Sequence, residues 1–222
     1  MIMKKIMFND EYSLTQAVLD GRKTMTRRMV KRNQLFKRDP DGMWTDDEIV
    51  AWENSGISES DFSSKEDMMD AFEWLKAHIP YKVGEVIAIA QSYKTVYHEQ
   101  GLETMDMMVS RLKNSKGWSN KMFVKAELMP HQIRITNVRV ERLQDISYAD
   151  CLREGIGKSA TDNLIGYLFA IPFNYYCGID KRGNRYVTPR EAFATLIDKV
   201  SGKGTWDSNP FCFVYEFELL NQ

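Results

Sequence analysis

The sequence predicts an α+β protein, a small mixed β-barrel with short flanking helices and helical or loop insertions. Strand-like runs recur along the whole chain, and the segments between them contain short capped helices. The connections between these runs lack the regular strand–helix alternation of a doubly wound parallel sheet. A chain of 222 residues, 43% of them hydrophobic, is long enough to bury a core.

The strands are expected from apolar runs and from alternation. They cover residues 2–8, 84–91, 121–128, 132–142 and 211–220. The second run follows a turn at Gly84, and Ile133 and Ile135 alternate with polar residues in the fourth. The last run, "FCFVYEFELL", places aromatic residues at every second position from Phe211 to Phe217, which predicts a closing strand with one buried face.

Helices are expected where a capping residue precedes an apolar stripe. Ser13 and Gln16 match a capping box, Ser147 matches an N-cap, and Thr188 precedes the clearest helix of the chain. Each of these three helices is followed by a glycine that favours a C-terminal stop. The three glycines are Gly21, Gly155 and Gly202.

The chain is interpreted as a single domain, residues 1–222, with three insertions. The insertions are expected at about 33–79, 95–119 and 157–187. The first contains an amphipathic helix at 64–80, and the second is polar and is expected to be a mobile excursion.

Charge is distributed unevenly along the first eighty residues. Residues 1–40 hold ten Lys and Arg against four Asp and Glu, whereas residues 41–80 hold two against eleven. The first segment therefore carries a local basic field, although the whole chain has a formal net charge of −1. The acidic segment either neutralises the basic one or contacts a protein partner.

Cysteine usage and hydropathy predict a cytoplasmic protein. The three cysteines are far apart and form no C-x-x-C pair, which argues against a disulfide framework and a zinc site. The first residues have lysines but no apolar core, so a signal peptide is not expected. The apolar run "LIGYLFAIPF" is far shorter than a membrane span of roughly 20 residues.

Two apparent motifs are rejected. The G-K-S in "EGIGKSAT" follows a helix, and Leu152 stands where a phosphate-binding loop needs its first glycine, so Gly157 is interpreted as a turn residue. The three histidines are scattered and none has a second metal ligand at a suitable spacing. Neither a metal nor a cofactor is expected.

The stretch "DGRKTMTRR" is the strongest candidate for chemistry. Lys23 and Thr26 are three positions apart, a spacing that places both on one side of a helical or turn-like segment. A threonine nucleophile needs a base, and a lysine becomes one when burial or nearby cations lower its pKa. Arg22, Arg27 and Arg28 supply such cations and are candidate contacts for an anionic ligand. A solvated turn, an anion-binding site and a reacting pair all remain open.

Trp206 is a further candidate for ligand binding. It lies in the turn-prone stretch "GTWDSNPF" just before the last expected strand. A tryptophan in a loop at a barrel mouth can stack on a base, or it can cover the barrel end as part of the core.

Four stretches together resemble the ASCH domain family of the PUA-like superfamily, in particular its longer phage and prophage members. They are "LDGRKTMTRR", which matches the signature G-x-K-x-x-T-x-R, "YKVGEVIAIAQ", "ITNVRVERLQDISYADCLREGI" and "GTWDSNPFCFVYEFELL". The resemblance implies a compact PUA-like barrel whose cleft binds RNA or nucleotides. Small bacterial members that match at the signature are N4-acetylcytidine amidohydrolases, which implies Lys23 as base, Thr26 as nucleophile, Glu154 as proton donor and Arg28 as a ligand contact.

The expected function is therefore the binding of RNA, single-stranded nucleic acid or a modified nucleotide in a basic cleft. The alternative is an amidohydrolase that removes an acyl group from N4-acetylcytidine or a related nucleoside. A second alternative is a phage accessory protein that binds a host protein through the acidic segment 41–80. The sequence alone does not decide whether the protein is an enzyme.

Overall fold

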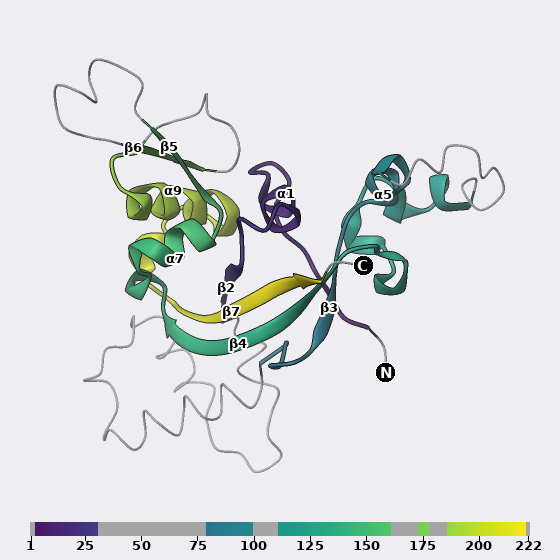
Figure 1. Ribbon diagram of the computed structural model, residues 1–222, viewed down its shortest axis with the longest axis horizontal. Coiled ribbons are helices and arrows are strands. Elements are labelled where there is room, and N and C mark those ends of the chain that lie inside the picture. The colour runs from purple at the N-terminus through teal and green to yellow at the C-terminus, as the bar shows by residue number, and fades with distance from the viewer. Residues whose placement is uncertain (1–2, 31–78, 100–110, 161–172, 178–185, 221–222) are drawn as a thin grey trace, which may run out of the picture.

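The computed structural model describes residues 3–30, 79–99, 111–160, 173–177 and 186–220. Five strands of these segments form one mixed sheet in the order β1-β3-β4-β7-β2 (Figure 1). The strands are β1 (Lys5–Ile6), β2 (Met25–Met29), β3 (Val86–Ile89), β4 (Gln132–Arg142) and β7 (Phe211–Leu220). Strands β1 and β3 are parallel, and every other pair in the sheet is antiparallel. The α+β class is confirmed, but within the described segments the sheet ends at β1 and β2 and does not close into a barrel.

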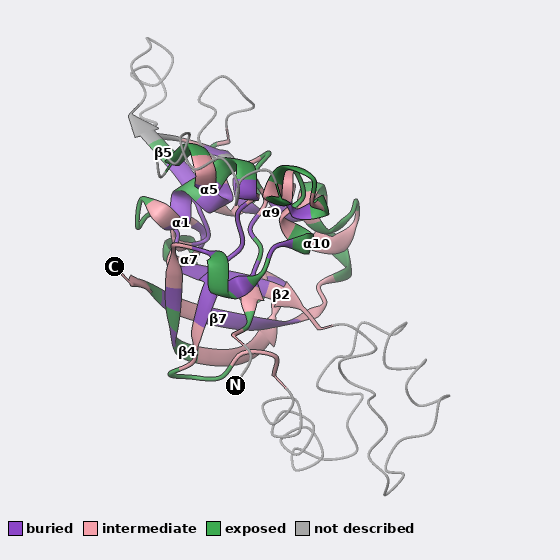
Figure 2. Ribbon diagram, turned by 90° about the vertical axis from the view of Figure 1, so that its right-hand side faces the viewer, coloured by how far each residue is buried: buried purple, intermediate pink, exposed green. Residues whose placement is uncertain are grey.

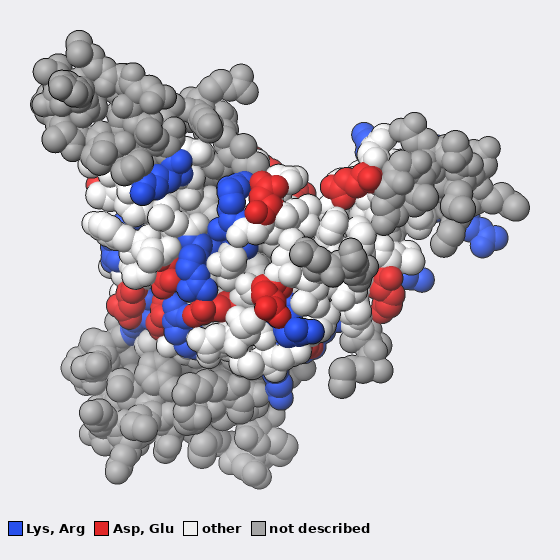
Figure 3. All heavy atoms as spheres, in the orientation of Figure 1, with Lys and Arg blue, Asp and Glu red and all other residues white. Residues whose placement is uncertain are grey.

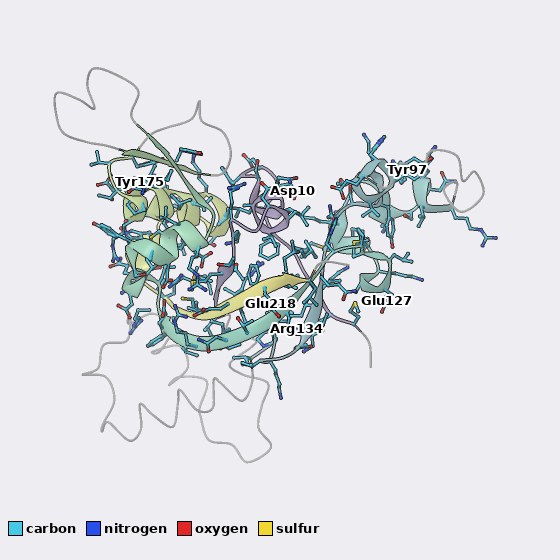
Figure 4. All side chains as sticks on the ribbon, in the orientation of Figure 1. Asp10, Tyr97, Glu127, Arg134, Tyr175 and Glu218 are labelled. Carbon is cyan, nitrogen blue, oxygen red and sulfur yellow. The ribbon has the colours of Figure 1, made fainter. Side chains whose placement is uncertain are left out.

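The long pair β4 and β7 forms the centre of the sheet. Its register opposes Arg134 to Glu218, and their side chains meet at 3.1 Å (Figure 4). The register shifts between Ile135 and Asn137, which is a local bulge in β4. The predicted strands at 132–142 and 211–220 are therefore confirmed almost to the residue.

Strands β5 (Ile156–Ala160) and β6 (Phe173–Cys177) form a separate antiparallel pair. The sequence analysis assigned most of this region to an insertion and expected no strand in it. Gly157 lies in β5 opposite Tyr176, so its interpretation as a turn residue is wrong. A Cβ atom added at this position would lie 2.1 Å from the Tyr176 ring. Glycine is thus required for close packing between the two strands.

Five α-helices have four or more residues in the described segments. They are α1 (Leu14–Leu19), α5 (Tyr93–Glu99), α7 (Tyr148–Arg153), α9 (Pro189–Ser201) and α10 (Thr205–Ser208). The Ser147 hydroxyl accepts a hydrogen bond from the Asp150 amide, and the Thr188 hydroxyl accepts one from the Glu191 amide. Both predicted N-caps are therefore confirmed.

The capping box predicted for α1 is wrong. Ser13 has a φ of 53° and its side chain makes no capping hydrogen bond. Gln16 instead donates to the Asp20 carboxylate at 2.7 Å, and the helix starts on a bond of 2.9 Å from the Leu14 amide to the Asn9 carbonyl. The predicted stop is confirmed, because Gly21 follows the helix with a φ of 71°.

The strand predicted at 121–128 is also wrong. This region forms two 3-10 turns, η3 (Lys121–Phe123) and η4 (Ala126–Leu128). The Lys5 ammonium donates to the carbonyl groups of Met122 and Val124, and the Lys125 amide donates to the Tyr93 hydroxyl. Side chains therefore satisfy backbone groups that a strand would present to a neighbour.

The main hydrophobic core lies where α1, α7 and α9 meet the sheet. Figure 2 shows buried residues concentrated on β7, β2 and the helical segments that face them. Its largest fully buried side chains include Phe193, Phe213 and Tyr215. A second, smaller cluster packs α5 against the opposite end of the sheet (Figure 1).

Several predictions fall outside the described segments. The amphipathic helix predicted at 64–80 and the acidic stretch 41–80 lie outside the described residues, apart from their last two positions. The insertion predicted at 95–119 begins inside α5 and ends just after the 3-10 turn η2 (Lys116–Trp118), and its described part consists of helical segments and turns. No helix in the described part of the chain has the length and apolarity to cross a membrane.

Candidate functional site

Strand β2 places the signature residues beside the last strand. Met25 to Met29 pair with β7, and Thr26 lies directly opposite Tyr215. Lys23 and Thr26 are therefore not on one side of a helical or turn-like segment, because the chain is extended from Met25 onward. Because side chains alternate along a strand, Thr26 and Arg28 share one face of the sheet.

Three backbone hydrogen bonds hold the segment that precedes β2. The Lys23 amide donates to the Ala17 carbonyl at the end of α1, at 2.8 Å. The Thr24 amide donates to the Arg153 carbonyl at the end of α7, and the Thr24 carbonyl accepts from the Phe217 amide, both at 3.0 Å. The Lys23 backbone is thus held between two helix ends and the central sheet.

Lys23 and Glu154 form a buried ion pair. The Lys23 Nζ atom lies 2.7 Å from Glu154 Oε2 and also donates to the Glu154 backbone carbonyl at 2.7 Å. Only 2% of the Lys23 side chain and 5% of the Glu154 side chain are exposed. Glu154 follows α7 directly, and Gly155 ends the helix with a φ of 101°. The helix end therefore aims both the carbonyl and the carboxylate of Glu154 at Lys23.

Arg27 holds the second oxygen of the same carboxylate. Its Nη1 atom donates to Glu154 Oε1 at 3.1 Å, and its Nη2 atom contacts Glu141 and lies 3.7 Å from the Asp150 carboxylate. The guanidinium is fully buried, which explains why three carboxylates surround it. Arg27 therefore positions Glu154.

The charged groups around Arg27 continue onto the surface of the sheet. Arg139 contacts Glu141, Asp150 and Glu216, and Arg153 contacts Asp150 and Glu216. Figure 3 shows basic and acidic side chains interspersed on the face that carries α7 and β4. Because the two signs neutralise each other there, this face is a poor candidate for binding a polyanion.

The environment of Lys23 shifts its proton affinity. Burial lowers the pKa of Lys23 below its ordinary value of 10.5, the Glu154 carboxylate opposes this effect, and the charges of Arg28 and Arg27 reinforce it. The direction is the one that a lysine needs to act as a base.

A cavity of about 640 Å³ lies against this ion pair. Its polar lining includes Lys23, Thr26, Arg27, Arg28 and Glu154, and its apolar lining includes Phe8, Phe193 and Phe213. The residues that the sequence analysis selected as base, nucleophile and proton donor are thus brought together around one cavity. Their roles stay predictions.

Several polar atoms at this cavity have no partner in the described structure. Arg28 Nε and the Tyr215 hydroxyl are buried without a hydrogen bond, although Arg28 Nη2 donates to the Met7 carbonyl. The Thr26 hydroxyl makes no hydrogen bond to any described residue. Burial raises the pKa of Tyr215, so that its hydroxyl remains a donor at neutral pH. Unpartnered donors beside a cavity are available to a ligand.

Two of the predicted ligand contacts lie elsewhere. Arg22 is exposed and pairs with Asp20 at 3.0 Å. Trp206 lies in the short helix α10, where its ring meets the Phe193 ring edge to face at 6.1 Å and Arg190 lies 5.0 Å above it. Neither residue lines the cavity, and the position of Trp206 matches the alternative in which it covers the core.

The sequence analysis missed Tyr215 and Phe193 as cavity residues. Alternation along the last strand did place Tyr215 on the same face as Phe213. Its position opposite Thr26 follows only from the pairing of β2 with β7, and no local pattern reports that register.

No protein-family model, curated protein or solved structure matches this chain. Among the residues that the structure describes, no group of three or more His, Cys, Asp or Glu side chains is placed to hold a metal ion. The functional argument therefore rests on the geometry of the cavity.

Proposed function

We propose that the protein binds a nucleobase in this cavity, either from single-stranded nucleic acid or as a modified nucleoside or nucleotide. The observation that carries the proposal is the composition of the cavity, with aromatic and aliphatic walls around a small set of buried polar groups. Its volume of about 640 Å³ lies within the range of small-molecule sites. A flat heterocycle with several hydrogen-bonding atoms matches both features.

The unpartnered donors support the same ligand class. Arg28 Nε and the Tyr215 hydroxyl need acceptor atoms, and pyrimidine and purine rings carry carbonyl oxygens and ring nitrogens as acceptors. The proposal includes the family and fold: the chain is an ASCH-like protein with a PUA-like barrel, as its four resembling stretches imply. That resemblance adds the expectation of an RNA or nucleotide ligand.

Calorimetric titration tests the proposal. The probes are the four ribonucleosides, their 5′-monophosphates and N4-acetylcytidine. Binding without chemistry requires that Thr26→Val leave the affinity within about threefold and that Arg28→Met lower it at least about tenfold, because a charged donor is lost. Absence of binding by every probe would overturn the proposal.

A second candidate is hydrolysis of an N-acylated nucleoside. Two observations favour it. Lys23 and Glu154 are in contact at 2.7 Å, and Thr26, which lines the same cavity, has a hydroxyl without a hydrogen-bond partner among the described residues. Transfer of one proton across that contact converts the ion pair into a neutral amine and a carboxylic acid, which are the base and the acid that the reaction needs.

The proposed reaction has two steps, acylation of Thr26 and hydrolysis of the resulting ester. The Lys23 amine takes the Thr26 proton as Oγ1 attacks the acyl carbonyl carbon, and the C–N bond breaks as Glu154 protonates the leaving nitrogen. Water hydrolyses the acyl–Thr26 ester and releases the acid, with Lys23 and Glu154 again sharing one proton. Chromatographic detection of cytidine released from N4-acetylcytidine tests this candidate. Release must disappear in Thr26→Ala while the fold survives.

The third possibility, a host-protein partner for the segment 41–80, concerns residues outside the described part of the chain apart from its last two.

A further inference from the structure

A basic lobe lies at the end of the sheet opposite to α7 and α9 (Figure 1). It comprises α5 and residues 111–129, which include the 3-10 turns η2, η3 and η4. Tyr93, Val124 and Met129 are among the buried side chains that hold it together, and Gly117 packs against the Tyr93 ring. The lobe is thus a packed platform.

Large apolar side chains point outward from this platform. Phe123 is 50% exposed and its neighbour Met122 is 58% exposed, while Leu128 is 41% exposed. Val124 and Ala126 of the same segment are buried in the cluster that holds the lobe together, whereas these three side chains are not part of it. Exposed aromatic and methionine side chains gathered on one packed segment are typical of a binding surface.

Cations accompany these side chains. Residues 111–128 contain five Lys and Arg and one acidic residue, Glu127. The Lys116 ammonium lies 5.5 Å from the centre of the Phe123 ring, and the Lys113 ammonium lies 6.0 Å from the Trp118 ring. Lys125 is exposed and makes no contact with an acidic group of the described structure. Tyr97 of α5 and Glu127 lie on opposite sides of the lobe (Figure 4).

The lobe is joined to the cavity by two lysines. Lys5, which lines the cavity, donates to the carbonyl groups of Met122 and Val124 at 2.7 and 2.5 Å. Lys121 reaches back to the carbonyl of Phe8, another cavity residue. Met7, which lies between Lys5 and Phe8 in the sequence, lines the same cavity and is 38% exposed. Residues 5–8 therefore contribute to the cavity lining and are also hydrogen-bonded to the lobe.

We propose that the basic lobe binds single-stranded nucleic acid, with a base stacked on Phe123 and the phosphates contacting Lys116, Lys113 and Lys125. Aromatic side chains interleaved with lysines form the usual platform for single strands, because stacking and phosphate neutralisation act together and tolerate any sequence. The inference rests on the proposed function in one respect: the bound strand continues from the nucleobase held in the cavity.

Fluorescence anisotropy with labelled 12-nucleotide RNA and DNA of mixed sequence tests this inference. The variants are Phe123→Ala and Lys116→Gln, and the matched controls are Tyr148→Ala, a residue 58% exposed on α7, and Lys203→Gln, which is exposed near α10. Phe123→Ala should weaken oligonucleotide binding at least about fivefold. Lys116→Gln should reduce the slope of log affinity against log salt concentration by about 0.7. Both controls should match the wild type.

Mononucleotide binding separates this inference from the proposed function. The lobe variants should bind ribonucleosides and monophosphates with wild-type affinity, because these ligands reach only the cavity. Equal affinity of the wild type and the lobe variants for the oligonucleotides would overturn the inference even if the cavity binds nucleosides. Loss of oligonucleotide binding in the lobe variants, in a protein that binds no nucleoside, would support the lobe and overturn the proposed cavity site. A protein that binds neither ligand overturns both.

Discussion

Lys23 Nζ and Glu154 Oε2 lie 2.7 Å apart across 131 positions of sequence, and both side chains are almost completely withdrawn from solvent. Isolated buried charges are among the most destabilising features a fold can contain, so each group depends on the other. The pair therefore couples the segment before β2 to the end of α7, and it forms one wall of the candidate cavity.

Removal of one member of this pair should destabilise the fold strongly. Lys23→Met leaves Glu154 with Arg27 as its remaining cation, and Glu154→Gln leaves the Lys23 ammonium without a buried counter-charge. We expect each substitution to cost about 3–5 kcal/mol in the free energy of unfolding. Urea titration monitored by circular dichroism measures this cost, provided that the m value is unchanged.

The double variant and a surface pair provide the controls. Lys23→Met combined with Glu154→Gln should cost less than the sum of the single changes, since no unpaired charge remains at that contact. Arg22→Ala breaks an exposed pair with Asp20 and should change the stability by less than about 1 kcal/mol. Additive single and double effects would contradict the coupling.

The stability difference between the wild type and Lys23→Met should depend on pH. The pKa of Lys23 is lowered in the folded state by burial, so between the folded value and 10.5 the unfolded chain binds more protons than the folded one. The unfolding free energy of the wild type therefore increases relative to that of Lys23→Met as pH rises through this window. Denaturant titrations of both proteins at intervals from pH 7 to 10 measure the trend.

The comparison with Lys23→Met also cancels the contribution of the tyrosines to the pH dependence of stability, because both proteins contain them. Burial raises the pKa of Tyr81 and Tyr215, which weakens both proteins alike above their ordinary value of 10. If the gap between the two proteins instead shrinks as pH rises, then Glu154 has raised the pKa of Lys23, and the base proposed for hydrolysis loses its support.

The features that the sequence predicted well are those fixed by neighbouring residues. Ser147 and Thr188 cap their helices through hydrogen bonds to amides three positions later, so the pattern and the structure coincide. Strands β4 and β7 were predicted because alternation reports which face of a strand is buried. Each of these signals lies within a dozen residues.

Strand β2 was not predicted because the face that carries Arg27 is buried by residues far away in the sequence. Arg27 reads as a surface residue in "MTRRM", yet Glu141, Asp150 and Glu154 bury it completely. Periodicity cannot report a charge whose counter-charges lie more than a hundred positions away. The same limit hid the position of Tyr215, whereas Glu154 was selected only through the resemblance to ASCH proteins.

Two buried thiols should resist alkylation in the native protein. Burial raises the pKa of Cys151 to about 12 and also raises the pKa of Cys212, and only the thiolate reacts at an appreciable rate. With iodoacetamide at pH 8, peptides containing Cys151 and Cys212 should remain unmodified in buffer and become fully modified in 6 M guanidinium chloride. Mass spectrometry of a tryptic digest measures both. Rapid native labelling of Cys212 would show that β7 opens under native conditions.

Gly155 should be the least replaceable glycine near the site. It has a φ of 101°, and an added Cβ atom would lie 3.1 Å from Leu14 Cδ2 and 3.5 Å from Lys23 Cδ. Gly155→Ala therefore combines an unfavourable backbone conformation with a tight contact on the Leu14 side chain of α1, and we expect a loss of about 2–3 kcal/mol in the free energy of unfolding. Gly21→Ala is the matched control, because Gly21 also has a positive φ of 71° but no atom within 4 Å of the new Cβ. That control should cost about 1 kcal/mol from the backbone alone. Equal losses in the two variants would mean that Leu14 moves aside freely, which would argue against tight packing between α1 and the end of α7.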